Sequence, residues 1–581
     1  MHYARVPSAY WRDRLQKMKD CGLNTVQTYV PWNFHEPRPG VFDFSGDRNL
    51  SYFLQTAQDV GLLVIVRAGP YICAEWDMGG LPAWLLTHKD IALRSSDTVY
   101  LDYVDKWMTQ LLPIVKSHLY SNNGPVITVQ VENEYGSYYA CDKKYMEHLY
   151  VLFRYLLGDD VVLFTTDGDS DGYLKCGTLT PYLYATVDFG VTVDPAANFK
   201  SQRDYEPKGP LVNSEFYTGW LDHWGQPHQT KSSKAVADSL YLILKLNASV
   251  NMYMFEGWDQ LCVLELVQML GSTYQPQPTS YDYNAPLTEA GDPWEKYTLV
   301  SQVISSYTGT VPYTPLVEPK GAYGKVYMTA AVGLFDSPQL VANQVSSDTP
   351  VSMEMLGQSF GFMIYSTKLP SELTGRSSSS MTISGLKDRA SVYIDGVLKG
   401  TGMRGDPVKS DVSLTIDIPS GAVDLDIVVE NMGRINYGSL LNDSKGILGS
   451  VGIDGQALTQ WVSKAVPLDN STLIPFQQLN ETVRMPNSTV FYRGTFRFDG
   501  QAYSTYLNVS GWSKGVAFVN GYSLGRYWPV KGPQKTLYVP GAFLRSNTEL
   551  NELILFEIDH SPCIPPYNNC FVSLVDTPDI G

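Results

Sequence analysis

The sequence predicts an α/β protein, a (β/α)8 or TIM barrel with a truncated first strand, followed by two antiparallel β-sandwich or jelly-roll domains. Up to Tyr297, apolar strand-like runs alternate with amphipathic helical patterns, as in parallel βα units. Beyond Tyr297 the helical period stops, and short alternating segments separated by Gly, Pro, Asn and Asp follow. The 581 residues are also too many for a single hydrophobic core.

The barrel region contains seven expected strands. They are almost continuously apolar, which is typical of strands covered by helices on both faces. The strands are expected at Thr25–Val30, Leu62–Arg67, Val126–Val131, Val161–Thr165, Ala185–Phe189, Leu211–Ser214 and Val250–Phe255. The clearest helical patterns lie at Tyr10–Lys19, Tyr52–Val60, Tyr100–His118, Lys144–Leu157 and Ser233–Leu246.

A closed barrel of this type needs one strand more, and the chain begins where its first strand should be ending. Met1 is followed by His-Tyr-Ala-Arg-Val-Pro, with no apolar core of a signal peptide. A barrel without one strand exposes two unpaired edges. We therefore expect this sequence to be an incomplete version of a longer one, and to fold poorly alone.

The second half is expected to be β-structure throughout. Clear strand patterns include Ala390–Ile394 before Asp395-Gly396, Val412–Ile418, Val423–Val429, Val490–Phe498 and Ala517–Asn520 before Gly521. Prolines are frequent in Val311–Tyr323, and a second boundary is expected near Thr472–Pro486. The expected domains are the barrel at 1–307, a linker at 308–345, and β-sandwiches at 346–475 and 476–581.

The formal net charge of −16 argues against nucleic acid as a partner, because its phosphates would be repelled. No apolar run approaches the roughly 20 residues needed to span a bilayer. The sequence leaves a monomer and a homodimer open. The eight His show no metal-ligand spacing, and no phosphate-binding or dinucleotide glycine pattern is present. We therefore expect neither a metal nor a cofactor.

Two features favour a secretory route. Seven Asn-x-Ser/Thr acceptor sites occur, at Asn49, Asn247, Asn442, Asn470, Asn480, Asn487 and Asn508. Among the seven cysteines, Cys563 and Cys570 bracket a Pro-Pro turn and could close a short loop. Cys141 and Cys176 are candidate partners across a longer one, although spacing alone does not fix connectivity.

Carboxylates follow two of the expected strands. The strand Pro125–Val131 runs into Glu132-Asn133-Glu134, and Pro210–Val212 runs into Asn213-Ser214-Glu215. Active sites of (β/α)8 barrels lie at the carboxyl ends of the strands, and retaining glycoside hydrolysis needs two carboxyl groups about 5–5.5 Å apart. With a period of two, Glu132 and Glu134 are expected to point the same way. Spacing alone does not choose between them.

The segments at 129–138 and 213–225 resemble the two signature segments of family 35 glycoside hydrolases, which are retaining β-galactosidases. Animal lysosomal members of the family are the most similar. The resemblance extends to Thr28–Pro37, Gly69–Leu86, Gln277–Gly291, Val429–Gly438 and Asn520–Pro529. It implies hydrolysis of terminal β-galactose, a lysosomal or secreted location, and a galactose-binding-like last domain.

The resemblance also implies roles for individual residues. Glu134 would be the acid/base and Glu215 the nucleophile, with Asn133 on the sugar 2-hydroxyl. The implied galactose pocket consists of Tyr29, Ala74, Glu75, Asn133, Tyr253 and Tyr283, with Trp220 nearby.

One segment departs from the family. After Gly257 the family continues Gly-Thr-Asn-Phe-Ala-Tyr-Trp-Asn-Gly, whereas this chain reads Trp-Asp-Gln-Leu-Cys-Val-Leu-Glu. Reading the family's codons one base early gives these residues, so we expect Trp258–Leu270 to be a frame-slipped copy of that loop. If the segment is genuine, the alternative function is a catalytically weak galactoside-binding homologue.

Overall fold

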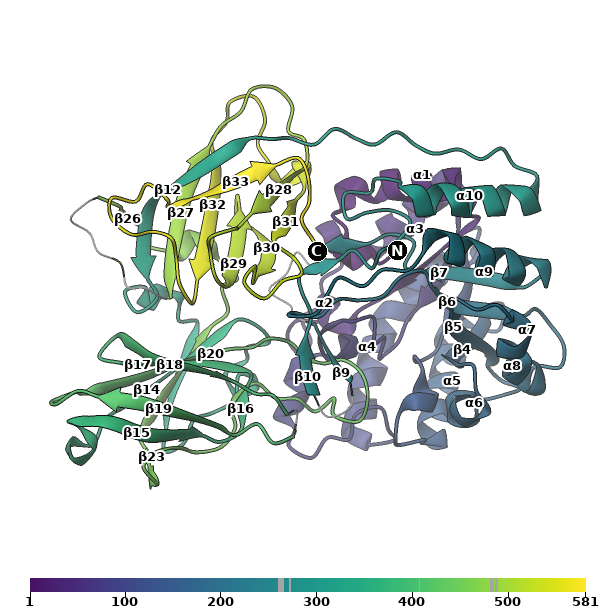
Figure 1. The fold of residues 1–581 in the computed structure, drawn as a ribbon. Helices are drawn as coiled ribbons and strands as arrows, with labels where there is room; N and C mark the ends of the chain where they lie inside the picture. Colours follow the sequence, from purple (N-terminus) through teal and green to yellow (C-terminus); the bar gives the residue numbers. More distant parts are fainter. Residues whose placement is uncertain (260–265, 271–272, 407, 481–484, 486–488) are drawn as a thin grey trace.

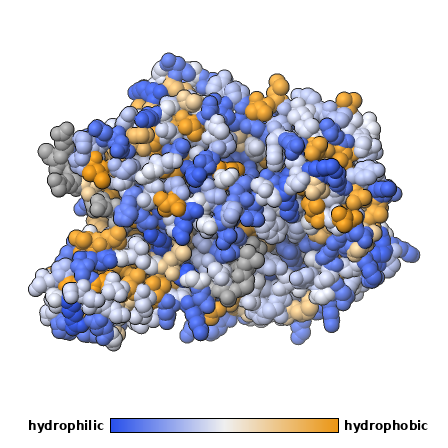
Figure 2. Space-filling model, viewed as in Figure 1, coloured by the Kyte–Doolittle hydropathy of each residue, from blue (hydrophilic) through white to orange (hydrophobic). Residues whose placement is uncertain are grey.

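The computed structural model describes residues 1–259, 266–270, 273–406, 408–480, 485 and 489–581. The barrel region occupies one side of the molecule and the two β regions the other (Figure 1). In the described part of the chain, no helix is both long and apolar enough to cross a membrane. The face seen in Figure 2 is largely hydrophilic, with hydrophobic residues in small separate groups.

The seven expected strands of the barrel are confirmed, and they pair in parallel in chain order. They are β1 (Thr25–Tyr29), β2 (Leu63–Arg67), β3 (Val126–Gln130), β4 (Val162–Gly168), β5 (Tyr184–Gly190), β6 (Val212–Tyr217) and β7 (Ser249–Tyr253). The larger helices are α1 (Trp11–Asp20), α3 (Leu50–Val60), α4 (Thr98–Ser117), α5 (Lys143–Leu157), α9 (Ser233–Lys245) and α10 (Glu295–Thr308). The strands carry buried valine and leucine toward these helices, which explains their continuous apolar pattern.

The sheet is open between β1 and β7, which are its two edge strands, as expected. The first residues of the chain lie against both edges. The Met1 amino group donates to the Gln27 carbonyl of β1 at 3.3 Å. The His2 imidazole lies 3.3 Å from the Tyr253 hydroxyl of β7. Tyr3 is fully buried against Trp11 of α1.

A long extended segment leaves α10 and crosses the molecule to β12 (Gly324–Gly333), as Figure 1 shows. β12 lies in the middle of a nine-stranded sheet, between β27 (Val490–Phe496) and β33 (Phe571–Val575). The range 308–345, expected as a linker, therefore contains a strand of the C-terminal sheet. β12 is apolar on its buried side, which the proline-rich sequence before it obscured.

The middle β domain packs a six-stranded sheet against a four-stranded one. The larger sheet has the order β13 (Asn343–Ser347), β25 (Trp461–Val466), β14 (Phe362–Lys368), β20 (Asp424–Glu430), β17 (Arg389–Ile394) and β18 (Val397–Met403). The smaller has β19 (Val412–Ile418), β15 (Arg376–Ile383), β23 (Val451–Ile453) and β24 (Gln456–Ala457). One buried apolar core lies between them.

Two of the expected turns are tight hairpins. Asp395 and Gly396 both have positive φ, 46° and 76°, between β17 and β18. Asn520 and Gly521, with φ of 49° and 87°, connect β29 (Gly515–Val519) to β30 (Tyr522–Tyr527). Two consecutive left-handed residues match the twist of the flanking strands, so these dipeptides favour the hairpin.

The segment that departs from the family after Gly257 is only partly described by the structure. β8 (Trp258–Asp259), β9 (Leu266–Leu270) and β10 (Thr273–Pro276) flank residues 260–265 and 271–272, which lie outside the described residues. The expectation of a frame-slipped copy falls largely on those residues and stays a prediction. The expected boundary near Thr472–Pro486 also falls partly outside the described residues.

Candidate active site

The carboxyl ends of the parallel strands bring polar side chains from distant parts of the sequence together. Tyr29 ends β1, Arg67 ends β2 and Tyr253 ends β7. Asp188 lies within β5, and Glu215 within β6. Parallel strands end at one edge of a sheet, so the fold itself assembles this group.

Glu215 is buried among donors that favour its ionised form. The Tyr29 hydroxyl donates to Glu215 Oε1 at 2.6 Å. The Arg67 guanidinium forms a buried ion pair with the same oxygen. Arg67 is itself fixed by the Gln130 side chain, whose Oε1 accepts from Nε at 2.6 Å. A guanidinium and a phenol thus both direct charge-assisted hydrogen bonds at one carboxylate oxygen.

Glu134 has the opposite environment. Burial, together with the negative charges of Asp188 and Glu215, raises the pKa of its carboxyl well above 4.5, and this outweighs the opposing effect of Arg67. Among the described residues, its side chain has one hydrogen-bond partner, Asn133, whose Nδ2 donates to Oε2 at 3.1 Å. This environment favours the protonated form of Glu134.

A single amide connects the two carboxyl groups. Asn133 Oδ1 accepts from the Tyr29 hydroxyl at 3.1 Å and from Gln130 Nε2 at 3.0 Å. The same Tyr29 hydroxyl also contacts Glu215, while Asn133 Nδ2 faces Glu134. Because the acceptor oxygen is occupied, the orientation of this amide is fixed and its N–H groups point into the site.

Glu132 lies in a different environment from Glu134. It is 1% exposed and forms a buried bidentate pair with Arg94, at 2.7 and 3.0 Å. The Tyr145 hydroxyl donates to it at 2.9 Å. The expectation that Glu132 and Glu134 point the same way is wrong, because β3 ends at Gln130. Both glutamates then adopt left-handed φ, 62° and 44°, so strand alternation no longer applies.

Ala74 and Glu75 lie in a tight turn beside the strand ends. Cys73, Ala74 and Glu75 all have positive φ, and Arg5 clamps the turn by donating to the carbonyls of Ala74 and Glu75 at 2.9 and 2.8 Å. The Glu75 carboxylate accepts from the Tyr281 hydroxyl and, at 3.4 Å, from the Tyr253 hydroxyl. Burial raises the pKa of Glu75 to about 6, and the Tyr281 hydrogen bond opposes the rise.

Aromatic rings form the remaining wall. Tyr253 and Tyr283 meet edge to face with centroids 5.7 Å apart, and Trp220 lies 6.2 Å from Tyr283. All the residues expected for the galactose pocket contact this cluster or the hydrogen-bond network beside it. Such a wall offers flat apolar faces with polar tips.

Sequence reasoning missed several residues of the site. Arg67 could have been found from the sequence, because it is a charged residue at the end of an otherwise apolar strand. Asp188 likewise interrupts an apolar strand, and burial and Glu215 raise its pKa well above 3.8. Tyr281 lies two positions before Tyr283 in the sequence, and the sequence pattern did not single it out.

Tyr437 had no local signal, because it reaches the site from the middle β domain. The Tyr71 hydroxyl donates to the neighbouring Asn436 carbonyl at 2.5 Å. Burial raises the pKa of Tyr437, and the charge of Glu134 raises it further. Arg434 joins the same segment to the barrel through Asp77, at 3.1 Å. The site is therefore completed by a second domain.

The structure pairs both sets of candidate cysteines. Cys141 bonds to Cys176, with a sequence separation of 35, and Cys563 bonds to Cys570. The first bridge joins the loop after Glu134 to α6 (Asp171–Gly177). The loop after Glu134 is therefore covalently fastened to the next βα unit.

Comparisons with known proteins agree with this geometry. Residues 1–307 match the family model described as Glycosyl hydrolases family 35. Residues 350–469 match "Beta-galactosidase, first all-beta domain", and residues 489–549 match "Beta-galactosidase, galactose-binding domain".

Curated relatives are similar over the whole chain. "Beta-galactosidase" of Canis lupus familiaris is 46% identical, over 100% of this chain and 88% of the relative. The Homo sapiens "Beta-galactosidase" is also 46% identical, over 100% and 87%. "Beta-galactosidase-1-like protein" of Mus musculus is 45% identical, over 97% and 87%. The expected resemblance is confirmed: this chain belongs to glycosyl hydrolase family 35.

Proposed function

We propose that this protein is a retaining exo-glycosidase that removes terminal β-D-galactose from β-galactosides. The relatives named β-galactosidase support the substrate. The observation that carries the mechanism is the pair of carboxyl groups with opposite environments. Glu215 is paired with Arg67 and accepts from the Tyr29 hydroxyl, while burial and nearby negative charges raise the pKa of Glu134.

In the first step Glu215 attacks C1 of the galactose from the face opposite the leaving group. Glu134 donates its proton to the glycosidic oxygen as that bond breaks, so the aglycone leaves as a neutral alcohol. The Glu215 carboxylate becomes an ester, and a covalent galactosyl-enzyme intermediate remains.

In the second step the roles of Glu134 reverse. Esterification removes the negative charge of Glu215, which is one of the causes of the raised Glu134 pKa. Glu134, now ionised, takes a proton from water as the water attacks C1. The ester breaks, Glu215 regains its charge, and galactose leaves with its β configuration retained.

The neighbouring residues supply recognition. Asn133 has a fixed amide that presents N–H donors toward Glu134, where the sugar 2-hydroxyl must lie. Hydrogen bonds to that hydroxyl strengthen in the transition state. Glu75, held by Tyr253 and Tyr281, offers a carboxylate for sugar hydroxyls. The aromatic wall of Trp220 and Tyr283 suits the C–H face of the ring.

The proposed location is lysosomal or secreted. Two disulfides and seven glycosylation acceptors support an oxidising, secretory compartment. No observation on the described residues favours the alternative of a weak galactoside-binding homologue, since both carboxyl groups have suitable partners.

The proposal is tested by hydrolysis of p-nitrophenyl β-D-galactoside. We expect turnover by the natural chain, and none above background with Glu215→Gln. The matching α-galactoside and β-glucoside serve as substrate controls. Binding of galactose by the natural chain without turnover would instead support the binding homologue.

A further inference from the structure

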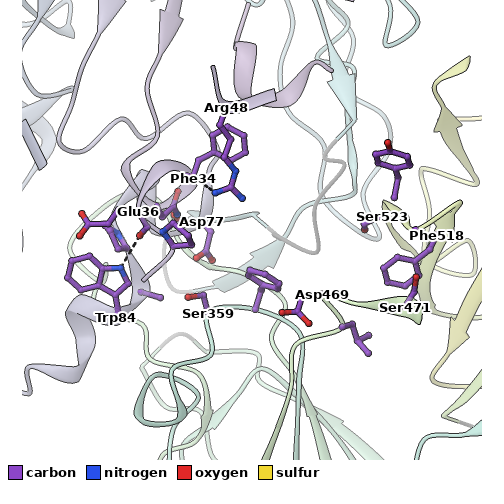
Figure 3. A pocket seen from close by; sticks show the side chains of 18 residues that line it. Phe34, Glu36, Arg48, Asp77, Trp84, Ser359, Asp469, Ser471, Phe518 and Ser523 are labelled. Carbon is purple, nitrogen blue, oxygen red and sulfur yellow. Dashed lines mark hydrogen bonds between the residues drawn. The ribbon is translucent and has the colours of Figure 1, made fainter. Parts of the chain in front are cut away.

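A second cavity lies away from the catalytic glutamates, where the barrel and both β domains meet (Figure 3). Its volume is about 310 Å³, and none of the residues proposed to hold galactose lines it. Trp84 comes from the barrel, Ser359 and Asp469 from the middle domain, and Phe518 and Tyr522 from the C-terminal domain. Its size is that of a small-ligand pocket.

Aromatic rings lie at both ends of this cavity. Trp84 is at one end, with Phe518 at the other, and Ser359 and Asp469 lie between them (Figure 3). Tyr522 lines the cavity from the same hairpin as Phe518; it is 49% exposed, and one face of its ring stacks on Phe543 at 4.1 Å. The arrangement is elongated, with flat apolar faces separated by polar groups.

The polar groups of the cavity are mainly acceptors. Of the carboxylates that line it, Glu36 already accepts from Trp32 Nε1 and the Gly40 amide, and Asp77 is paired with Arg434. Arg48 is also engaged, because Nη1 donates to the Phe34 carbonyl at 2.5 Å and the guanidinium lies over the Phe34 ring. Among the described residues, Asp469 is therefore the charged group left to face a ligand, and its charge disfavours an anion. A neutral ligand with hydroxyl donors fits this acceptor.

The Ser359 hydroxyl and the Asp469 carboxylate form no hydrogen bond with any residue that the structure describes. Ser471, which lines the same cavity, also keeps its hydroxyl without such a bond. Three polar groups therefore stay available to a ligand: Ser359 and Asp469 between the two ends of the cavity, and Ser471 at the Phe518 end (Figure 3).

The cavity shares a wall with the galactose pocket. Asn33 lines the cavity and accepts from Trp76 Nε1 at 2.7 Å, and Phe34 meets the Trp76 ring edge to face at 6.0 Å. On its other side Trp76 lies under the guanidinium of Arg5, which holds the Glu75 carbonyl at 2.8 Å. The loop that carries Glu75, Trp76 and Asp77 thus lies between this cavity and the proposed galactose pocket.

We propose that this three-domain cavity is an accessory saccharide-binding site, which holds a glycan residue other than the terminal galactose being cleaved. A saccharide has C–H faces that suit the aromatic rings and hydroxyl donors that the Asp469 carboxylate and the serine hydroxyls can accept. The inference rests on the proposed function for its substrate class, because an enzyme acting on glycans meets such residues beside every terminal galactose.

The test compares a short and a long substrate. Tyr522→Ala and Asp469→Asn are the cavity variants, and Tyr155→Ala on α5, 82% exposed, is the control. For a galactose-terminated biantennary N-glycan, we expect the cavity variants to lower kcat/KM about five-fold, the scale of one lost aromatic contact. For p-nitrophenyl β-galactoside we expect kcat/KM within about two-fold of the natural chain, because the catalytic centre is untouched. The control should change neither.

A second arm uses the same N-glycan with its galactose removed, observed by saturation-transfer NMR. Binding to the natural chain and to Tyr155→Ala, lost in Tyr522→Ala, supports the site without any turnover. A kinetic effect shows that the cavity holds the inner part of the cleaved glycan. Binding with unchanged kinetics assigns it to a separate glycan strand.

The proposal is overturned if neither arm distinguishes the cavity variants from the control, or if both substrates lose activity equally. Binding of tetramethylammonium without binding of the glycan would also overturn it, in favour of a cation site. Failure of the natural chain to cleave the aryl galactoside counts against the proposed function alone, since the NMR arm needs no catalysis.

Discussion

Glu132 and Glu134 show how two identical side chains, two positions apart, acquire different chemistry from their surroundings. Glu132 forms a buried ion pair with Arg94 and accepts from the Tyr145 hydroxyl. Among the described residues, the Glu134 carboxyl has an amide as its single donor, and it lies near other carboxylates. The sequence alone left both open, because the backbone turn that separates them depends on left-handed φ at both positions.

The raised pKa of Glu134 predicts the alkaline side of the pH–activity profile. As the acid, Glu134 must carry its proton, so kcat/KM falls as the pH rises through its raised pKa. Glu134→Gln should lower kcat/KM about 10²- to 10⁴-fold and remove that limb, as measured with a p-nitrophenyl substrate across pH. Persistence of the limb in this variant would assign it to another group, such as Glu75, whose pKa is about 6.

Substitution of Arg67 is expected to lower both the stability and the activity of the protein. Arg67→Met leaves the buried Glu215 carboxylate without its ion-pair partner. We expect the free energy of unfolding to fall by about 3–5 kcal/mol, together with a loss of kcat. Arg67→Lys keeps the charge but not the fork that also holds Gln130, so it should lose less. Denaturant titration and kinetics of both variants check this, and equal effects would contradict it.

At the scale of elements, the barrel strands were predictable because helices bury them on both faces, which leaves long apolar runs. Hairpins at Asp395-Gly396 and Asn520-Gly521 were predictable because their dipeptides favour left-handed backbone. The role of β12 was not, because its partners β27 and β33 lie far along the chain. Tyr437 was missed for the same reason, since its segment reaches the site through tertiary packing.

The two disulfides predict different losses of stability. In the chain-entropy model, removing the Cys141–Cys176 bridge, with 35 residues of separation, costs about 4 kcal/mol. Removing Cys563–Cys570, with a separation of 7, costs about 2 kcal/mol by the same relation. Paired Cys→Ala variants, compared by urea unfolding, check the order. We also expect only the first pair to lower kcat, because it fastens the loop after Glu134. The reverse order would contradict this account.

At the scale of the molecule, the three regions share buried surfaces and complete one another. Phe362 of the middle domain packs on Phe556 of β32 (Asn551–Glu557), and Trp258 beside the barrel packs on Tyr538 of β31 (Thr536–Val539). The Arg434–Asp77 pair anchors the middle domain to the loop beside Glu75. We expect one cooperative unfolding transition for the whole chain.

Substitution of Phe556 tests whether the three regions unfold together. It is fully buried between Phe362 and Phe491, with ring centroids 5.1 and 4.2 Å away. Phe556→Ala should lower the free energy of unfolding by about 3–5 kcal/mol and keep a single transition. Phe335→Ala, at a ring that is 38% exposed, is the control and should cost far less. Two separate transitions in the natural chain, measured by calorimetry, would show that the domains unfold independently.

The most direct test of the central claim is to trap the proposed intermediate. A 2-deoxy-2-fluoro-β-galactosyl fluoride should inactivate the protein, and mass spectrometry of peptides should find one fluorogalactosyl group on Glu215. Proton NMR of an aryl galactoside reaction should show β-galactose as the first product. A label on Glu134, Glu132 or Glu75, or α-galactose formed first, would contradict the assignment of Glu215 as nucleophile and Glu134 as acid/base.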